Sequence, residues 1–523
     1  MTSGAGGNTS MPDWLAARAA LSPDRLALAV GDERLSFRDL DARANAVARK
    51  LAGLGVGPGD RVAVLLGSGA PAVELAHAVG RAGAVLVPLN VRLTPAELAW
   101  QLADARPRLL LYDTVHAGPA TAIAVPGAPG LSLLSEREGR APRPFAPGEK
   151  GMEGAGVPAL HVDKLAALSE ATAPPREEID LDAAHTIIYT SGTTGRPKGA
   201  MLTYGNHWWS AVGSALNLGL REDDRWLAPL PLFHVGGLSI LMRSVIYGIP
   251  ALVHERFDPV AVNRAIDEDG VTIVSVVAAM PRRMFDARGD RPYPPTLRCA
   301  LLGGGPAPLP LLEECLRRGV PVVQTYGMTE TASQAVTLAP ADALRKVGSA
   351  GKPLLPTRLR IEQDGQPAPA GAVGEIVVRG PTVTPGYWER PEETARALRD
   401  SWLHTGDLGR LDAEGYLYVL DRRSDLIISG GENVYPAEVE AALLAHPAVA
   451  EAGVVGEADS TWGQVPVAYV VSRLDVAVTP DALIAFARER LARYKVPARV
   501  YSVAALPRNA AGKTLRRELR WPQ

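Results

Sequence analysis

Apolar positions along the first part of the chain follow two periods, one typical of helices and one typical of strands. Residues 37–54 and 71–82 carry apolar side chains at helical spacing, and Pro71 opens the second segment, where proline is tolerated. Residues 61–66 and 84–88 are short apolar runs that predict buried strands. Strands that alternate with helices in this way indicate a parallel, doubly wound sheet with right-handed crossovers.

The same alternation returns farther along, after a stretch of different composition. Residues 117–180 are rich in Pro, Gly and Ala and weak in periodicity, so we expect part of this stretch to be a surface excursion. Strand-like runs then follow at 186–190, 273–277, 300–302 and 322–324. These runs predict a second α/β region.

The last third of the chain changes character. Short alternating strands at 374–378 and 415–420 predict a small β-rich subdomain. Farther on, a strand at 449–455 lies between helical patterns at 436–445 and 480–494. This part predicts a separate small α+β domain.

Together these patterns indicate the α/β fold class and divide the chain into four segments. The large domain is expected to contain the doubly wound sheets and the β-rich subdomain, and the small domain is expected to move relative to it. The segments are a flexible N-terminal tail (1–12), the large N-terminal domain (13–421), a hinge (422–425) and the small mobile α+β C-terminal domain (426–523).

Composition and charge narrow the function. The 523 residues include 55 Lys and Arg against 57 Asp and Glu, so the net charge of −2 gives no global field that favours nucleic acid or an anionic membrane. The two cysteines, Cys299 and Cys315, exclude a disulfide framework and disfavour a Cys-based zinc site, so we expect buried thiols. The sequence shows neither a signal peptide nor a run of roughly 20 apolar residues. We therefore expect a cytoplasmic protein with no stable membrane insertion.

The strongest chemical signal is a loop rich in glycine and hydroxyl side chains at residues 189–199, directly after a strand-like run. Glycine lets backbone N–H groups approach an anion, hydroxyls add donors, and lysine supplies a cation. A ligand-binding loop at the carboxyl end of a strand is typical of open α/β folds. The candidate phosphate ligands are Thr190, Ser191, Gly192, Thr193, Thr194, Gly195 and Lys198.

This loop differs from a Walker A loop. In that motif lysine directly follows glycine and precedes Ser or Thr, whereas Arg196 and Pro197 precede Lys198 here and Gly199 follows it. The pattern therefore favours phosphate binding without ordinary γ-phosphoryl transfer. The loop resembles the core motif of the adenylate-forming superfamily, which contains acyl-CoA synthetases, adenylation domains of peptide synthetases and luciferases. The resemblance spans almost the whole chain, because further superfamily motifs follow in the expected order.

A second motif, residues 326–330, brings a carboxylate to the expected phosphate site. A carboxylate is favourable there only if a cation lies between it and the phosphates, so Glu330 is the candidate Mg²⁺ ligand. Thr329 is a candidate hydrogen-bond donor to a phosphate oxygen. The resemblance implies that Tyr326 stacks near adenine. It also implies that the loop containing Gly304 borders both the adenine and the acyl group.

Three residues nearer the C-terminus match further superfamily positions. An Asp can accept hydrogen bonds from both ribose hydroxyls, and the resemblance assigns that role to Asp407, a second ribose contact to Arg422, and the substrate carboxylate and α-phosphate to Lys513. Two like unit charges about 4 Å apart repel by roughly 4 kcal/mol at an effective dielectric constant near 20. Mg²⁺ and Lys513 can offset this repulsion when a carboxylate attacks a phosphate.

The two steps of such an enzyme have conflicting needs. An acyl-adenylate must form away from water, yet a bulky CoA thiol must then enter. A small domain on a hinge satisfies both needs by carrying Lys513 in for the first step and out for the second. By resemblance the hinge is Ser424, where many relatives have Asp or Lys. The segment with Gly430, Gly431 and Glu432 would then line the CoA path.

A closer resemblance suggests which acid is activated. Segments 203–214, 233–243 and 328–334 are similar to those of the o-succinylbenzoate–CoA ligases of menaquinone synthesis. This resemblance implies that 2-succinylbenzoate is activated at its succinyl carboxyl group. The second carboxylate of this substrate then needs a buried cation or several donors.

Two of the candidate acyl-pocket residues have a structural alternative. Arg243 and Ser333 are the candidates for the second carboxylate, and a structural salt bridge is the alternative for Arg243. His234 matches the superfamily gate between the acyl pocket and the thiol path, with a hydrogen-bonded core histidine as the alternative.

Three rival functions stay open. They are a CoA ligase for another aryl or fatty acid, a γ-phosphate-transferring ATPase or kinase, and a catalytically silent nucleotide-binding scaffold. The complete set of charged motif residues argues against the last of these. The favoured function needs ATP, Mg²⁺ and coenzyme A together with an aromatic dicarboxylate, and the sequence leaves the oligomeric state open.

Overall fold

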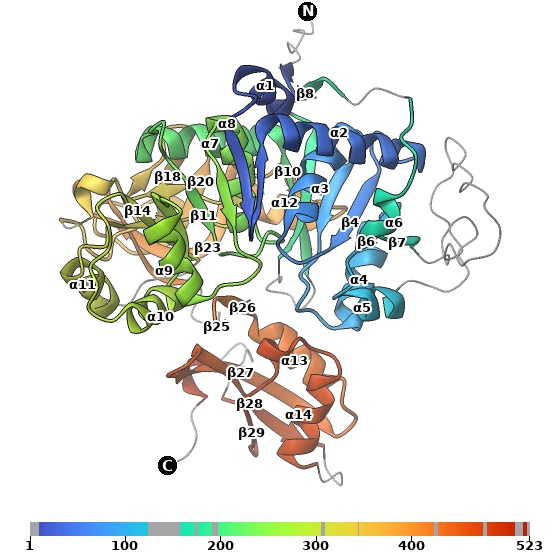
Figure 1. Ribbon diagram of the computed structural model, residues 1–523. Helices are drawn as coiled ribbons and strands as arrows, with labels where there is room; N and C mark the ends of the chain where they lie inside the picture. The colour runs from blue at the N-terminus through green and yellow to red at the C-terminus, as the bar shows by residue number, and fades with distance from the viewer. Residues whose placement is uncertain are drawn as a thin grey trace, which may run out of the picture.

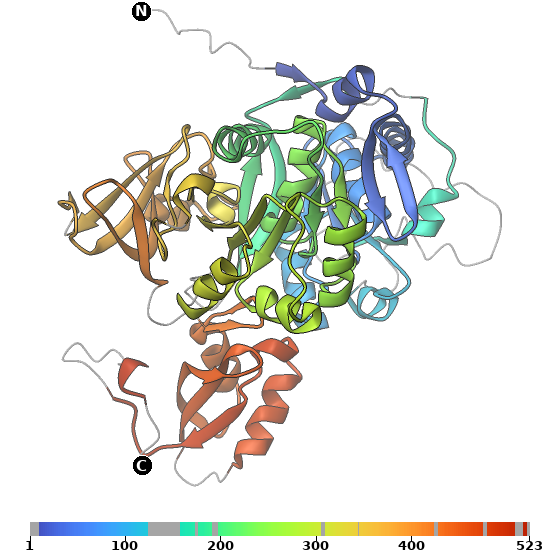
Figure 2. The same cartoon turned by 60° about the vertical axis from the view of Figure 1, so that its left-hand side comes forward.

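The computed structural model shows a large domain of two packed sheets, a β-rich subdomain beside it and a small C-terminal domain (Figures 1 and 2). The α/β architecture predicted from the sequence is confirmed. The structure describes residues 10–123, 157–172, 176–190, 197–304, 309–343, 345–363, 365–422, 427–473, 478–507 and 516–519.

One sheet of the large domain has nine strands in the described chain. Its central strands, from β15 to β2, are parallel, and β3, β16 and β17 form antiparallel pairs with their neighbours at the two edges. The strands, in order across the sheet, are β17 (Lys352–Pro353), β16 (Val336–Thr337), β15 (Val322–Tyr326), β14 (Cys299–Gly303), β13 (Ile273–Val277), β11 (Trp226–Ala228), β12 (Ala251–Val253), β2 (Leu26–Val30) and β3 (Glu33–Ser36).

The other sheet of the large domain has seven strands among the described residues. Five of them are parallel, and β10 pairs antiparallel with both β9 and β21. The strands, in order, are β21 (Gly386–Tyr387), β10 (Lys198–Thr203), β9 (Ala184–Thr190), β5 (Val85–Pro88), β4 (Arg61–Leu65), β6 (Leu109–Tyr112) and β7 (Ala159–His161).

The largest hydrophobic core lies between these two sheets. Alternate residues of a strand enter different cores: Val62 and Val64 of β4 face the helices between the sheets, whereas Ala63 and Leu65 face the outer helices. Helices α2 (Phe37–Gly53), α3 (Ala70–Arg81) and α8 (Val235–Tyr247) fill the space between the sheets, with α1 (Trp14–Leu21) and α7 (Tyr204–Leu218) beside α8. The outer helices are α4 (Pro95–Ala105) and α5 (Ala117–Ile123) on one sheet and α9 (Pro259–Glu268), α10 (Ala279–Arg288) and α11 (Leu309–Arg317) on the other.

Local sequence explains where several of these helices begin. Helix α2 starts after Ser36, whose hydroxyl accepts from the N–H of Asp39 while the Asp39 carboxylate accepts from the N–H of Ser36. Thr94 and Glu97 form the same capping box before α4. Such caps satisfy N–H groups that the helix itself leaves unpaired. The helix start that positions Glu97 is therefore well defined.

The β-rich subdomain lies at one side of the large domain, as Figure 2 shows. It is an antiparallel sheet that ends in a hairpin formed by β23 and β24. Its strands are β19 (Gln366–Pro367), β18 (Arg358–Gln363), β20 (Gly374–Arg379), β23 (Trp402–Leu411), β22 (Leu398–Arg399) and β24 (Leu417–Arg422), with helix α12 (Pro391–Ala397) alongside.

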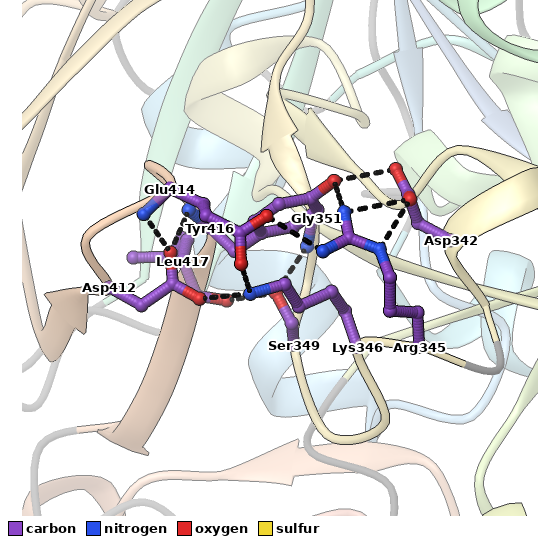
Figure 3. A network of polar contacts seen from close by, with 9 residues as sticks. All are labelled: Asp342, Arg345, Lys346, Ser349, Gly351, Asp412, Glu414, Tyr416 and Leu417. Atoms are coloured by element: carbon purple, nitrogen blue, oxygen red, sulfur yellow. Dashed lines mark hydrogen bonds and ion pairs between the residues drawn. The ribbon is translucent and has the colours of Figure 1, made fainter.

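A polar network joins the β23–β24 hairpin to Asp342, Arg345 and Lys346, which precede β17 in the sequence (Figure 3). The Tyr416 hydroxyl donates to Asp342 over 2.6 Å and accepts from Arg345 over 2.7 Å. Lys346 donates to Asp412 and to Glu414, each over 2.7 Å. The network thus anchors the hairpin that carries Asp407 and Arg422.

The C-terminal domain lies beneath the large domain in both views, with β25 and β26 nearest to it (Figures 1 and 2). Its long antiparallel pair β27–β28 is extended by β29, which runs parallel to β28. Helices α13 and α14 pack on this sheet around a hydrophobic core of their own. The elements are β25 (Ile427–Ser429), β26 (Glu432–Val434), α13 (Pro436–Leu444), β27 (Val449–Asp459), β28 (Gly463–Ser472), α14 (Pro480–Arg488), the 3₁₀ turn η3 (Arg493–Lys495) and β29 (Arg499–Ser502).

Some local predictions are wrong. Of residues 117–180, part of which was expected to be a surface excursion, the described parts contain α5, β7, α6 (Val162–Ala166) and β8 (Glu178–Asp180), whose strands the sequence patterns did not predict, and residues 124–156 and 173–175 lie outside the described residues. Residues 10–12, expected in a flexible tail, form β1 (Ser10–Pro12) and pair with β8. The helix predicted over 480–494 ends at Arg488. These elements depend on partners distant in sequence, which a local pattern does not reveal.

The described residues also bear on two expectations from the sequence, one about the cysteines and one about membrane-spanning helices. Cys299 and Cys315 are free and buried, as expected, and burial raises the pKa of each thiol to about 12. Within the described ranges, no helix has the length and apolar character needed to cross a membrane.

Candidate active site

A cavity of about 1220 Å³ opens where the carboxyl ends of strands from both large sheets meet the β-rich subdomain and the C-terminal domain. Such a position is where open α/β folds bind ligands. The structure brings most of the described candidates to this one cavity. Those that line it are Thr190, Lys198, His234, Arg243, Gly304, Thr329, Glu330, Ser333, Asp407, Gly430, Gly431 and Glu432.

The two ends of the predicted phosphate loop are held together by strand pairing. Thr190 ends β9, Lys198 begins β10, and the two residues face each other in the antiparallel register. The Lys198 ammonium lies 5.3 Å from the centre of the Tyr387 ring, within range of a cation–π contact. One end therefore presents the Thr190 hydroxyl to the cavity, and the other presents the Lys198 ammonium.

Some predicted residues lie outside the described residues. These are Ser191, Gly192, Thr193, Thr194 and Gly195 of the phosphate loop, the hinge residue Ser424 and Lys513. Arg422 ends β24 and faces Asp407 in the register of that hairpin, and its side chain is likewise outside the description.

Tyr326 and Asp407 form a buried pair. The Tyr326 hydroxyl donates to a carboxylate oxygen of Asp407 over 2.7 Å. The exposed fractions of these residues are 6% and 7%. Tyr326 is not among the residues that line the cavity, whereas Asp407 is. The bond thus orients the carboxylate toward the cavity from behind.

The segment after β15 forms a tight loop around Glu330. Gly327 is required there, because a Cβ at this position would lie 1.6 Å from the carbonyl oxygen of Ser333. Ser333 itself has φ +88°, a strained conformation for a residue other than glycine. The loop closes on itself and directs Thr329, Glu330 and Ser333 into the same cavity.

Glu330 is a buried carboxylate with a tyrosine partner that sequence reasoning missed. The Tyr387 hydroxyl donates to Oε1 of Glu330 over 2.9 Å, and burial together with the nearby carboxylate raises the pKa of Tyr387. Within the described chain no group of three His, Cys, Asp or Glu side chains is arranged to hold a metal ion. A single carboxylate suits Mg²⁺ that is otherwise held by phosphates and water, so Glu330 fits that ion.

Arg243 lies on α8 with 2% of its surface exposed. One guanidinium nitrogen donates to the Ser210 hydroxyl over 3.2 Å, and the group lies 5.5 Å from the centre of the Trp226 ring. Among the described residues, its Nε has no hydrogen-bond partner and no carboxylate forms an ion pair with it. Burial lowers the pKa of Arg243, but a guanidinium stays charged. The structural salt bridge considered as an alternative is therefore absent among the described residues.

His234 precedes α8 and faces the C-terminal domain. Its Nε2 lies 3.1 Å from Oε2 of Glu432, and Arg92 pairs with the other oxygen of the same carboxylate. Although 43% of the His234 side chain is exposed at the cavity, the surrounding protein desolvates the ring and, with Arg92, lowers its pKa to about 4. The neutral ring can donate from Nε2 to Glu432.

The glycines before Glu432 allow the two domains to approach closely. A Cβ on Gly431 would lie 3.1 Å from Val277 at the carboxyl end of β13, and the φ of Gly431 is +85°. Glycine at this position therefore lets Glu432 reach the large domain. Arg92 is a further contact that sequence reasoning missed, and the only signal for it is its place just after β5.

The chain matches two family models. The model of the AMP-binding enzyme family covers residues 15–388, and the model of the AMP-binding enzyme C-terminal domain covers residues 438–513. The first match contains Lys198, Arg243 and Glu330. The second contains Lys513 and most of the small domain.

Individual relatives match over nearly the full length. The chain is 55% identical to the 2-succinylbenzoate–CoA ligase of Geobacillus kaustophilus over 514 residues, which cover 98% of each protein. It also resembles solved structures of o-succinylbenzoate CoA synthetase from Bacillus subtilis. A double mutant bound to the product analogue OSB-NCoA is 45% identical, covers 98% of this chain and 99% of its own, and gives a TM-score of 0.89.

Other forms of the Bacillus subtilis protein superpose less well. The complex with the acyl-adenylate OSB-AMP gives a TM-score of 0.73 at 44% identity and covers 98% of this chain and 99% of its own. The complex with ATP and magnesium ion gives a TM-score of 0.72 at 44% identity and covers 98% of this chain and 100% of its own. The two domains of this chain are thus arranged more like those in the product-analogue form. On fold, site and sequence alike, the chain belongs to the AMP-binding enzyme family, among the 2-succinylbenzoate–CoA ligases.

Proposed function

We propose that this chain joins 2-succinylbenzoate to coenzyme A in two steps. In the first, the succinyl carboxylate attacks the α-phosphorus of ATP, forms an acyl-adenylate and releases pyrophosphate. In the second, the CoA thiol attacks the acyl carbonyl, a C–S bond replaces the C–O bond to phosphate, and AMP leaves. The observation that carries the choice of acid is the buried guanidinium of Arg243, which lines the cavity without a carboxylate partner among the described residues.

The proposed nucleotide site lies on the side of the cavity built by the β-rich subdomain and the phosphate loop. Asp407, held by Tyr326, would accept from the ribose hydroxyls, and Arg422 would reach the same sugar. Lys198, Thr190 and the loop residues between them would surround the phosphates. The loop with Gly304 is the proposed neighbour of adenine, and Tyr326, which does not line the cavity, would act through Asp407.

Charge neutralisation is the main demand of the first step. The attacking carboxylate and the α-phosphate are both anions, so their approach needs fixed positive charge. Mg²⁺ bound beside Glu330 would supply part of it, and Thr329 would donate to phosphate. Lys513 is the proposed mobile cation, which contacts both reacting groups during adenylation.

The proposed acyl pocket extends from the nucleotide side toward α8. Arg243 would bind the ring carboxylate. A guanidinium suits a carboxylate better than an ammonium does, because the N–H donors of the guanidinium match both carboxylate oxygens. Ser333 would add a donor from the strained loop. A buried cation without its anion is costly, so the site is built for a diacid.

The proposed thiol path lies between the two domains. Gly430, Gly431 and Glu432 line the cavity opposite His234. His234 would separate the acyl pocket from this path, and Ser424 would be the hinge that lets the small domain change position. Because ATP and CoA are the proposed co-substrates, we place the reaction in the cytoplasm.

Product analysis tests this function. The enzyme would be incubated with ATP, Mg²⁺, CoA and a panel of acids that includes 2-succinylbenzoate, benzoate and fatty acids, and the CoA products would be identified by mass spectrometry. We expect 2-succinylbenzoyl-CoA with one AMP per thioester. Preference for a monocarboxylate would overturn the choice of acid, and release of ADP would overturn adenylation itself.

A further inference from the structure

Lys495 lies at the junction of the two domains and borders the same cavity, but no role is assigned to it above. Its ammonium is 2.8 Å from Oε1 of Glu97 in the large domain and 2.7 Å from Oε1 of Glu438 in the small domain. Only 4% of the lysine side chain is exposed. One buried cation therefore joins a carboxylate of each domain.

Neighbouring contacts dock the same face of the small domain on the start of α4. The Thr94 hydroxyl, whose single hydrogen is directed mainly to Glu97 over 2.9 Å, also lies 3.3 Å from the carbonyl oxygen of Arg490, and Asn90 donates to the Tyr494 hydroxyl over 3.4 Å. Ala492 packs into the hydrophobic cluster of the large domain that contains Leu98 of α4. Lys495 is the charged centre of this contact.

The electrostatics of the cluster favour contact between the domains. Burial favours the neutral amine, but Tyr494, Glu438 and Glu97 outweigh it and raise the pKa of Lys495. Burial also raises the pKa of Glu438, although Lys495 opposes this. The charged lysine thus stabilises two carboxylates that would otherwise be buried near each other.

Separation of the domains leaves each charge with a partner. Lys495 and Glu438 belong to the same domain and stay together. Glu97 keeps its capping-box bonds, in which its Oε2 accepts from the N–H and the hydroxyl of Thr94. Opening therefore breaks the Lys495–Glu97 contact without leaving a buried charge alone, as a reversible contact requires.

We infer that Lys495 is a positioning residue for thioester formation. Through its contact with Glu97, it holds the small domain in the position in which Glu432 contacts His234 and Arg92. This inference rests on the proposed two-step function. It is supported by the arrangement of the domains, which resembles that of the relative bound to its product analogue. Neither Lys495 nor Glu97 needs to touch the reacting atoms.

Glu97→Gln tests the contact with little other disturbance. Glutamine also serves at this position of a capping box, so α4 keeps its start while the charge opposite Lys495 is lost. Thioester formation would be followed in single turnovers of supplied acyl-adenylate with CoA, and adenylation by pyrophosphate release without CoA. We expect the first rate to fall by at least roughly tenfold and the second to stay unchanged.

Matched variants make the outcome decisive. Glu489→Gln removes an exposed carboxylate of the small domain that pairs with Arg490 and should change neither rate. Lys495→Arg keeps the charge and should retain more thioester formation than Lys495→Gln. Adding Lys495→Gln to Glu97→Gln should lower the thioester rate little further, because the contact is already lost.

Two results would overturn the inference. One is equal loss of both half-reactions in Glu97→Gln with an unchanged melting temperature, and the other is no loss in either. If the wild-type enzyme prefers a different acid, the adenylate of that acid replaces the 2-succinylbenzoyl adenylate and the test of Lys495 stands. If no acid yields AMP, the proposed function fails, and this result is distinct from either of those above.

Discussion

The nucleotide side of the cavity and its thiol side differ in how many domains build them. Asp407, Tyr326, Glu330 and Tyr387 all belong to the large domain, and the hydrogen bonds that join them in pairs, of 2.7 and 2.9 Å, are buried and partly buried respectively. On the thiol side, Glu432 of the small domain contacts residues of the large domain, and so does Lys495.

This difference separates two ways of preparing a site. Partners within one packed domain keep their geometry whatever the other domain does, so the nucleotide side is organised before and after any domain movement. Contacts across the junction exist only while the domains are docked. Loss of a cross-domain contact should therefore affect one half-reaction, whereas a defect on the nucleotide side should affect every step that needs bound nucleotide.

The largest effect is expected for Lys513→Ala, and it should fall on only one half-reaction, the one to which this residue is proposed to belong. Loss of its charge should slow adenylate formation by roughly 10³-fold, since the carboxylate then meets the phosphate without this cation. Thioester formation from supplied acyl-adenylate should remain. Rapid-quench measurement of both half-reactions checks this, with Lys513→Arg as the control that keeps the charge. Equal losses would contradict the proposed two arrangements.

Arg243→Ala should have the next largest effect and should depend on the acid. We expect kcat/KM for 2-succinylbenzoate to fall by roughly 10²-fold, because a buried ion pair with the ring carboxylate is lost. For 3-benzoylpropionate, which has the same chain and no ring carboxylate, the change should be small. Steady-state kinetics with both acids checks the difference. A similar loss for both acids would remove Arg243 from the carboxylate site.

Glu432→Gln sharpens the comparison on the thiol side with a smaller effect. Glutamine retains a hydrogen bond to His234 but loses the charge opposite Arg92, so we expect thioester formation to slow by roughly fivefold and adenylation to stay unchanged. Single-turnover rates check both. The control is Glu457→Gln, whose carboxylate pairs with Arg499 inside the small domain. If the control slowed thioester formation as much, a cross-domain role for Glu432 would be refuted.

Sequence patterns predicted the fold best where local signals agree. Helix α2 has both a capping box at Ser36 and buried residues at helical spacing, and its predicted range of 37–54 ends within one residue of the observed end. Strand β7 was missed because its three residues are stabilised by parallel pairing with β6 and by burial of Leu160. Such a strand has no periodicity of its own to read.

The site divides in the same way. Glu330 and Asp407 occur in motifs that name a chemistry, and the structure places both on one cavity although they are far apart in the sequence. Tyr387 and Arg92 were missed. Tyr387 reaches Glu330 because β21 pairs with β10, and Arg92 gains its partner only when the small domain docks. Roles created by tertiary pairing leave little trace in a local motif.

The smallest effect is expected in the network around Tyr416, which does not line the cavity. Tyr416→Phe removes the hydroxyl that joins Asp342 to Arg345 (Figure 3) but keeps the ring, whose centre lies 4.5 Å from the Lys346 ammonium. We expect the melting temperature to fall by about 1–2 °C and both half-reactions to keep their rates. Differential scanning fluorimetry and the same single-turnover assays check this, with Tyr416→Ala as the variant that also loses the cation–π contacts. A selective fall in adenylation in Tyr416→Phe would mean that this network tunes the Asp407 hairpin, and the nucleotide side would then depend on more than its own buried partners.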